Sequence, residues 1–189
     1  YIDNNLQDPL MVNHQYEFVN SEELEAVTNP ILWSSISETS TLKVYGYAPY
    51  ALSERGVDFS TTTTNGTTTI NYTVPVEVTD QFDLIATEVK TVPSNYGQNI
   101  PLTFQHILTG VRFKVGFACT VKSLKIVGVN FKGAYTIGED VWKIVDKSLV
   151  GTFAAPITSG RVCNEGDYIT KDDEIFMMIP QDIPDGAYV

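Results

Sequence analysis

Cations are scarce in this chain of 189 residues, where 12 Lys and Arg stand against 23 Asp and Glu and give a formal net charge of −11. A nucleic-acid-binding protein needs a cationic face that displaces counterions from the phosphates, and no basic stripe runs along this sequence. Binding to an anionic lipid surface is disfavoured for the same reason. We therefore expect that nucleic acid is not a partner.

Long apolar runs and catalytic signatures are also missing. No apolar stretch approaches the ~20 residues that a membrane-spanning helix needs. The sequence contains no P-loop, no G-x-S-x-G elbow, no dinucleotide-binding glycine motif and no H-E-x-x-H pair. Its two histidines, His14 and His106, lie far apart. We therefore expect no catalytic site, no cofactor and no metal, and we predict that the protein is not an enzyme.

The sparse reactive residues leave some alternatives open. Cys119 and Cys163 match no zinc spacing, and they either form a disulfide in an oxidising compartment or remain two small buried thiols. The acidic run at residues 172–174 offers oxygen ligands for calcium, but it matches no EF-hand loop and we expect a solvated turn. His106 falls on an apolar strand face, so we expect a hydrogen-bonded core residue rather than a base or a ligand.

Alternation of apolar and polar residues is the dominant pattern that the sequence does contain. From Val111 to Val121 the odd-numbered residues are apolar, and the even-numbered ones are mostly polar or small. Because successive side chains of a strand point to opposite faces, this pattern predicts a strand with one face on a core. Similar patterns predict strands at 42–50, 70–78, 82–89, 102–108, 123–131, 141–145 and 174–179.

Local signals refine this outline. Asn65-Gly66 favours a tight hairpin turn, and Pro75 predicts that the strand at 70–78 lies at an edge or is bulged. The change of parity at Thr109-Gly110 indicates a bulge or a bend. One short helix is expected where Asn20 and Glu23 could form a cap. Many short strands with turn-rich spacers predict an all-β protein with a sandwich architecture.

Several residues occur in an order that resembles the fimbrillin family of Bacteroides-type bacteria, which includes the major and accessory subunits of type V pili. The resemblance begins with Trp33 and a Tyr-rich strand that ends in Ala-Pro-Tyr, and it extends to about Gln181. We expect its structural signature residues to be Tyr45, Pro49, Tyr50, Phe104, His106 and Phe113. Further marks are Asp83-Leu84, Ile126-Val127-Gly128, Gly133-Ala134-Tyr135, Trp142 and Ile179-Pro180-Gln181.

This resemblance implies tandem transthyretin-like β-sandwich domains in an exported protein, usually a lipoprotein, that reaches the outer membrane or the cell surface. It also implies assembly with other pilus subunits through donor-strand exchange, and possible contact with a host or bacterial surface ligand. We place the domains at 1–98 and 99–189. The chain opens at Tyr1 without Met, so we expect a piece of a longer protein in which the second domain can be truncated.

Two other functions serve as alternatives to a structural or adhesive pilus subunit. A carbohydrate-binding surface lipoprotein would need several aromatic rings on one exposed face, and Trp33, Tyr45, Tyr47 and Tyr50 lie close together in the sequence. We expect these rings to pack in the sheet instead, since aromatic residues favour strands. A hydrolase would need two close carboxylates, or a nucleophile beside a base, and no residues stand out for either role.

Overall fold

The computed structural model describes residues 11, 13–20, 23–27, 41–50, 52–93 and 95–189. Strands dominate these residues, and the helical elements are two short 3-10 helices, η2 (Leu52–Arg55) and η3 (Val78–Asp80). The strands are β1 (Tyr16–Asn20), β2 (Glu23–Ala26), β3 (Thr41–Val44), β4 (Tyr47–Ala48), β5 (Phe59–Thr64), β6 (Thr67–Thr73), β7 (Ile85–Thr87), β8 (Lys90–Pro93), β9 (Phe104–His106), β10 (Thr109–Val111), β11 (Cys119–Val121), β12 (Lys125–Asn130), β13 (Lys132–Thr136), β14 (Val141–Ile144), β15 (Val150–Ala154), β16 (Arg161–Cys163) and β17 (Phe176–Met178).

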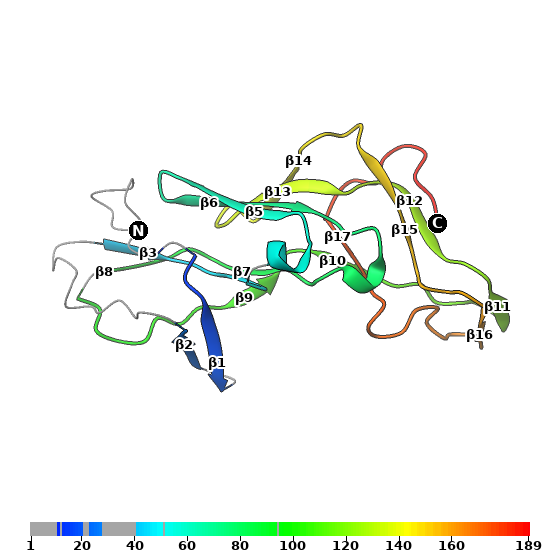
Figure 1. Ribbon diagram of the computed structural model, residues 1–189, viewed down its shortest axis with the longest axis horizontal. Coiled ribbons are helices and arrows are strands. Elements are labelled where there is room, and N and C mark those ends of the chain that lie inside the picture. The colour runs from blue at the N-terminus through cyan, green and yellow to red at the C-terminus, as the bar shows by residue number, and fades with distance from the viewer. Residues whose placement is uncertain (1–10, 12, 21–22, 28–40, 51, 94) are drawn as a thin grey trace.

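Two layers of strands face one another in the middle of the molecule (Figure 1). One layer is a four-stranded antiparallel sheet in the order β14-β13-β6-β5. The other contains β4-β7-β9 and, where the same chain segments continue, the pair β3-β8. This arrangement confirms the all-β sandwich predicted from the sequence.

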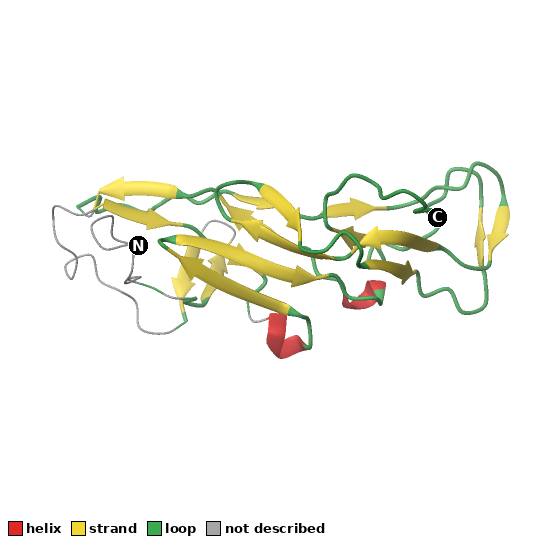
Figure 2. Cartoon of the chain, turned by 90° about the horizontal axis from the view of Figure 1, so that it is seen from above, coloured by secondary structure: helices red, strands yellow, loops and turns green. Residues whose placement is uncertain are grey.

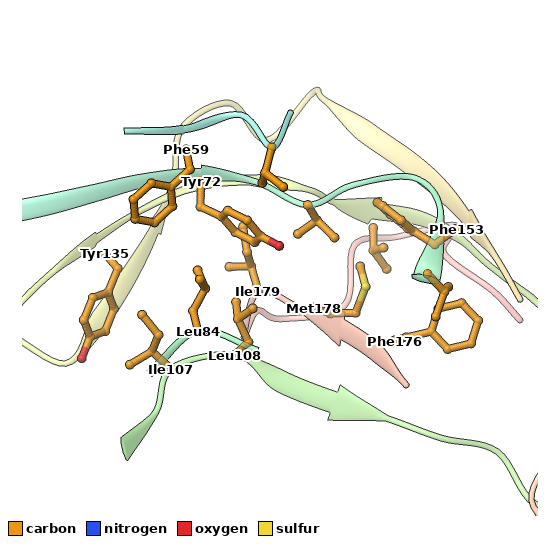
Figure 3. Close-up of a cluster of buried hydrophobic side chains, with 14 of the residues drawn as sticks. Phe59, Tyr72, Leu84, Ile107, Leu108, Tyr135, Phe153, Phe176, Met178 and Ile179 are labelled. Carbon is orange, nitrogen blue, oxygen red and sulfur yellow. The ribbon is translucent and has the colours of Figure 1, made fainter. Parts of the chain in front are cut away.

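The core fills the space between the layers, as Figure 3 shows. Ile70, Tyr72 and Val74 are each 1% exposed, because alternate residues of β6 and its extension point to the same side. Leu84, Ile107 and Leu108 meet them from the opposite layer. This burial supplies the hydrophobic stabilisation that the polar loops cannot.

Three two-stranded pairs extend the sandwich in one direction, so that the molecule is elongated (Figure 2). They are β12-β15, β10-β17 and β11-β16. Phe153 and Phe176, which lie in β15 and β17, belong to the same buried cluster as the residues of the sandwich. The pair β11-β16 lies at the far end, beside no third strand among the described residues.

Strands from both sides of residue 98 pair with each other. β6 pairs with β13 over five residue pairs, from Thr69↔Thr136 to Thr73↔Lys132. The buried cluster likewise draws on residues 52–86 and 107–179. The division into domains 1–98 and 99–189 stays a prediction, and any two such domains would share one sheet and one core.

Several local predictions are confirmed. Asn65 and Gly66, with φ of 51° and 73°, form the two-residue turn of the β5-β6 hairpin, since positive φ at both positions suits this turn. β12 and β14 lie inside their predicted ranges.

Other local predictions are wrong. β6 is an interior strand, because it pairs with β5 on one side and β13 on the other, and it ends at Thr73, before Pro75. The expected helix is the strand β2, where the Asn20 side chain donates to the Glu23 carboxylate at 3.2 Å within a hairpin. The segment from Val111 to Val121 is not one strand: β10 ends at Val111 and β11 begins at Cys119.

Candidate functional site

The outer edge of β12 is closed by a few contacts from the C-terminal segment. β12 pairs along its other edge with β15. On the outer edge, the Val127 N–H donates to the Tyr188 carbonyl at 2.9 Å, and the Tyr188 N–H donates to the Val127 carbonyl at 3.0 Å. An unpaired strand edge offers donors and acceptors to any other extended chain. This edge, with the covering segment at residues 181–189, is the candidate functional site.

The Gln181 side chain makes the hydrogen bonds that a neighbouring strand would make at the end of β12. Its side-chain oxygen accepts from the Asn130 N–H at 2.8 Å, and its side-chain nitrogen donates to the Asn130 carbonyl at 2.8 Å. The buried Asn130 side chain in turn donates to the carbonyls of Lys147 and Leu149, both at 3.1 Å, and so fixes the turn that leads into β15. One side chain thereby satisfies the two backbone groups that an edge would leave open.

Two glycines permit close packing, Gly128 at this edge and Gly133 in the four-stranded sheet. Gly128 has a φ of 79° at an irregularity of β12, and a Cβ there would lie 3.1 Å from the Ala187 Cα. At Gly133 a Cβ would lie 2.9 Å from the Trp142 ring and 3.0 Å from Ile179. Both glycines belong to the fimbrillin-like pattern, and the close contacts explain why a side chain does not fit there.

The covering segment buries little apolar surface of its own. Ile183 is 71% exposed, and Tyr188 and Val189 are each 64% exposed. Ala187 packs partly against the core. Because burial of apolar area is the main favourable term in such packing, four hydrogen bonds with few buried side chains hold the segment only weakly.

Tyr45 and its neighbour Gly46 contact both layers of the sandwich. The Tyr45 hydroxyl is 2.8 Å from the Thr68 hydroxyl of the facing sheet, and its ring packs partly against the core. A Cβ on Gly46 would lie 3.5 Å from the Phe104 ring. The Gly46 N–H also donates to the Thr87 hydroxyl at 2.9 Å. These contacts tie the start of the Tyr-rich strand to both layers.

Pro49 and Tyr50 follow β4 in a turn, where the Ala48–Pro49 peptide bond is cis and both residues are half-buried. Tyr47 precedes them, with its ring 5.5 Å from that of Phe59 and its hydroxyl donating to the Asn13 side chain. Burial raises the pKa of Tyr47. The aromatic rings of this strand therefore serve packing.

His106 is not a core residue. Its side chain is 75% exposed, and its Nδ1 lies 2.5 Å from the Asp83 carboxylate. The buried neighbours are Ile107 and Leu108. The alternation that placed His106 on an apolar face ends at this point, since two consecutive residues are buried where the chain passes from β9 to β10.

Phe113 lies apart from the other signature residues. Its ring packs edge-on to Phe176 at 6.2 Å, and its carbonyl accepts from the Ile169 N–H at 2.8 Å. The structure thus brings Tyr45, Pro49, Tyr50, Phe104 and His106 to one layer of the sandwich, and it places Phe113 beside β17. The role of these six residues as a structural signature stays a prediction.

The acidic run at 172–174 divides between solvent and interior. Asp172 and Asp173 are exposed in a turn as expected, but Glu174 is 4% exposed. Both terminal guanidinium nitrogens of Arg161 donate to the Glu174 carboxylate, at 2.5 and 3.0 Å. Arg161 holds the pKa of Glu174 below its usual value, with the Lys171 N–H assisting. The part of this prediction that made Glu174 a solvated turn residue is wrong, because Arg161 satisfies its charge.

A hollow of about 290 Å³ lies beside Trp142 and includes Glu88, Gln105, His106 and Asp140. The Trp142 indole N–H donates to the Ile107 carbonyl, and its ring lies 5.4 Å from that of Tyr135. The Trp142 side chain is therefore engaged in packing.

Trp33, the other predicted aromatic mark, lies outside the described residues. Within the described part of the chain, no group of three His, Cys, Asp or Glu side chains could hold a metal ion.

Residues 3–189 match the protein family described as fimbrillin-like, so the chain belongs to that family. The match covers almost the whole chain and confirms the resemblance seen in the sequence. No curated protein and no solved structure matches it. None of the helices among the described residues is long and apolar enough to cross a membrane.

Part of the site could be predicted from the sequence. Gln181 and Gly128 appear in the fimbrillin-like pattern, although their partners Asn130 and Ala187 do not. Tyr188 carried no signal, because a single residue that forms an isolated bridge has no alternation to recognise.

Proposed function

We propose that this protein is a structural or adhesive subunit of a bacterial surface pilus, assembled by strand exchange between subunits. In this proposal the acceptor is the outer edge of β12. A strand from a neighbouring subunit replaces the covering segment and forms the hydrogen bonds that Val127 and Asn130 now make with Tyr188 and Gln181. The role is non-enzymatic, and the protein is exported to the outer membrane or the cell surface as a lipoprotein.

The observation that carries the proposal is the weak closure of a strand edge. An added strand satisfies the same backbone groups and can bury side chains that the covering segment leaves in water. Such a contact joins two different surfaces of the subunit, and repeated head-to-tail contacts of this kind build fibres. Membership of the fimbrillin-like family supports the same role.

An engineered disulfide that locks the covering segment onto β12 tests the proposal. In a background with Cys119→Ser and Cys163→Ser, the pair Val127→Cys and Tyr188→Cys would tie the covering segment to β12, because these residues lie directly opposite each other. We expect bacteria that produce the full-length locked protein to display no pili under electron microscopy until a reductant is added. Val127→Cys alone in the same background is the matched control and should assemble. Normal pili from the oxidised locked protein would refute exchange at this edge.

The carbohydrate-binding alternative gains no support from the aromatic residues. Tyr45, Tyr47 and Trp142 are partly buried and pack against the core. A sugar-stacking platform needs exposed faces, and these rings use theirs within the protein.

A further inference from the structure

The two cysteines of the chain, far apart in the sequence, lie opposite each other in one pair of strands. β11 and β16 are antiparallel, with Cys119 facing Cys163, Thr120 facing Val162 and Val121 facing Arg161. Both cysteines are free thiols in the structure. Nothing in the fimbrillin-like pattern refers to either of them.

This register meets the geometric needs of a disulfide. Residues directly opposite in an antiparallel pair carry their side chains on the same face, with Cβ atoms about 4.5–5.5 Å apart. Directly opposite residues have Cα atoms about 4.5–5.5 Å apart, within the range of about 4.4–6.8 Å that a disulfide spans. The Cβ atoms must then approach to about 3.5–4.5 Å, a shift of about 1 Å. Burial agrees with this face: Cys163 is 2% exposed and Cys119 is half-buried, whereas Val162 on the opposite face is 80% exposed.

We propose that Cys119 and Cys163 form a disulfide across the β11-β16 ribbon in the exported protein. The thiolate of Cys119, the more accessible residue, attacks a disulfide of a thiol oxidant such as oxidised glutathione or an oxidoreductase. The Cys163 thiolate then attacks the resulting mixed disulfide. One Sγ–Sγ bond forms, two thiol protons are lost, and the two electrons reduce the oxidant to two thiols.

The bond has a structural consequence at the end of the molecule. Each strand of the ribbon has three residues, and among the described strands none lies beside it to complete a sheet. A two-stranded ribbon of this size is marginal in water. A disulfide would fix the register of this terminal ribbon (Figure 1) and hold Val162 of β16, which is 80% exposed, in place.

The first test is a redox titration of the protein with glutathione buffers, native and in denaturant. Free thiols are alkylated after quenching and counted by mass spectrometry. Disulfide formation and folding are linked, so a disulfide that stabilises the folded protein forms more readily in the folded protein by the same free energy. We expect the equilibrium constant for oxidation to be at least about tenfold larger in the native protein than in the denatured protein. No preference for the native state would overturn the inference.

A shifted pair is the matched control. Cys119→Ser with Val121→Cys keeps two cysteines on the same face, but it offsets them diagonally, with about 7–8 Å between them. We expect no native preference for this pair, and oxidation equal to that of the wild type would overturn the argument from register.

The second test addresses the cell, where the bond rests on the export that we propose. We expect protein taken from the bacterial surface, with its thiols blocked at lysis, to contain no free cysteine. Free thiols in protein from assembled pili would overturn the disulfide in vivo and leave the pilus function intact. Failure of the locked β12 variant to block assembly would refute strand exchange at the edge of β12 and leave the disulfide intact.

Discussion

The β5-β6 and β1-β2 hairpins have the same antiparallel pairing and differ in what lies beneath them. Phe59 in β5 is 8% exposed, and Ile70 and Tyr72 in β6 are each 1% exposed, since one face of that hairpin covers the core. All five residues of β1 are exposed, including Phe18 at 67% and Val19 at 56%. Among the described strands, β1 and β2 pair only with each other.

This difference shows that pairing alone does not stabilise a hairpin. An isolated two-stranded hairpin is marginal in water, because its hydrogen bonds mostly replace those made with solvent. The β11-β16 ribbon lies between the two cases, with a buried Cys163 on one face and an exposed Val162 on the other. The free energy of unfolding should therefore depend most on the packing of the sandwich, less on the contacts that hold the β11-β16 ribbon, and least on the β1-β2 hairpin.

Tyr72→Ala should have the largest effect, because it opens a cavity beneath the four-stranded sheet, where the Tyr72 ring lies 6.5 Å from that of Trp142. We expect a loss of about 3–5 kcal/mol in the free energy of unfolding, measured by urea denaturation. Tyr72→Phe is the matched control. The buried Tyr72 hydroxyl has no hydrogen-bond partner among the described residues, so its removal should change stability by less than about 1 kcal/mol. A large loss from Tyr72→Phe would mean that the hydroxyl is satisfied in solution.

Glu174→Gln should have an intermediate effect, because Glu174 and Arg161 connect the β11-β16 ribbon to β17. We expect a loss of about 2–3 kcal/mol at pH 7, from weaker hydrogen bonds to a charged group. Arg161 lowers the pKa of Glu174 below its usual value of 4.5 in the folded protein, so the folded state binds fewer protons than the unfolded state near that pH. The contribution is present above about pH 4.5 and is lost as the pH falls through the folded pKa.

Urea denaturation between pH 7 and pH 3 measures this effect, and the gap between wild type and Glu174→Gln should narrow in acid. Asp172→Asn removes a nearby carboxylate whose side chain is 97% exposed and pairs with Arg112 at 3.0 Å. Because exposed ion pairs contribute little, this control should change stability by less than about 1 kcal/mol. A gap that stays constant with pH would show that the Glu174 carboxylate does not supply the stability.

The features predicted correctly are those that depend on residues close together in the sequence. The Asn65-Gly66 turn follows from backbone preferences, and the alternation in Ile70–Val74 marks the buried face of β6. The predictions that were wrong concern regions whose structure depends on residues far apart in the sequence. Val111–Val121 alternates throughout, but the chain leaves one partner, β17, and reaches another, β16, between its two strands.

Side-chain partners that are distant in the sequence show the same limit, inside the candidate site and outside it. Glu174 looked like part of a solvated acidic run, because its partner Arg161 lies in another strand and is not apparent from the run itself. The register that brings Cys119 opposite Cys163 is likewise set by the packing of both strands. Gln181 could be noticed as part of a pattern, but its hydrogen bonds to Asn130 become visible only in the fold.

Phe18→Ser should have the smallest effect, because it changes a side chain that is 67% exposed on the β1-β2 hairpin. We expect a change of less than about 0.5 kcal/mol in the free energy of unfolding of the isolated subunit. Phe59→Ser, on the covered β5-β6 hairpin, is the matched substitution and should cost several kcal/mol, as buried Phe truncations do. Equal losses from the two variants, measured by urea denaturation, would mean that β1-β2 packs on the sandwich in solution and that the contrast between the two hairpins does not hold.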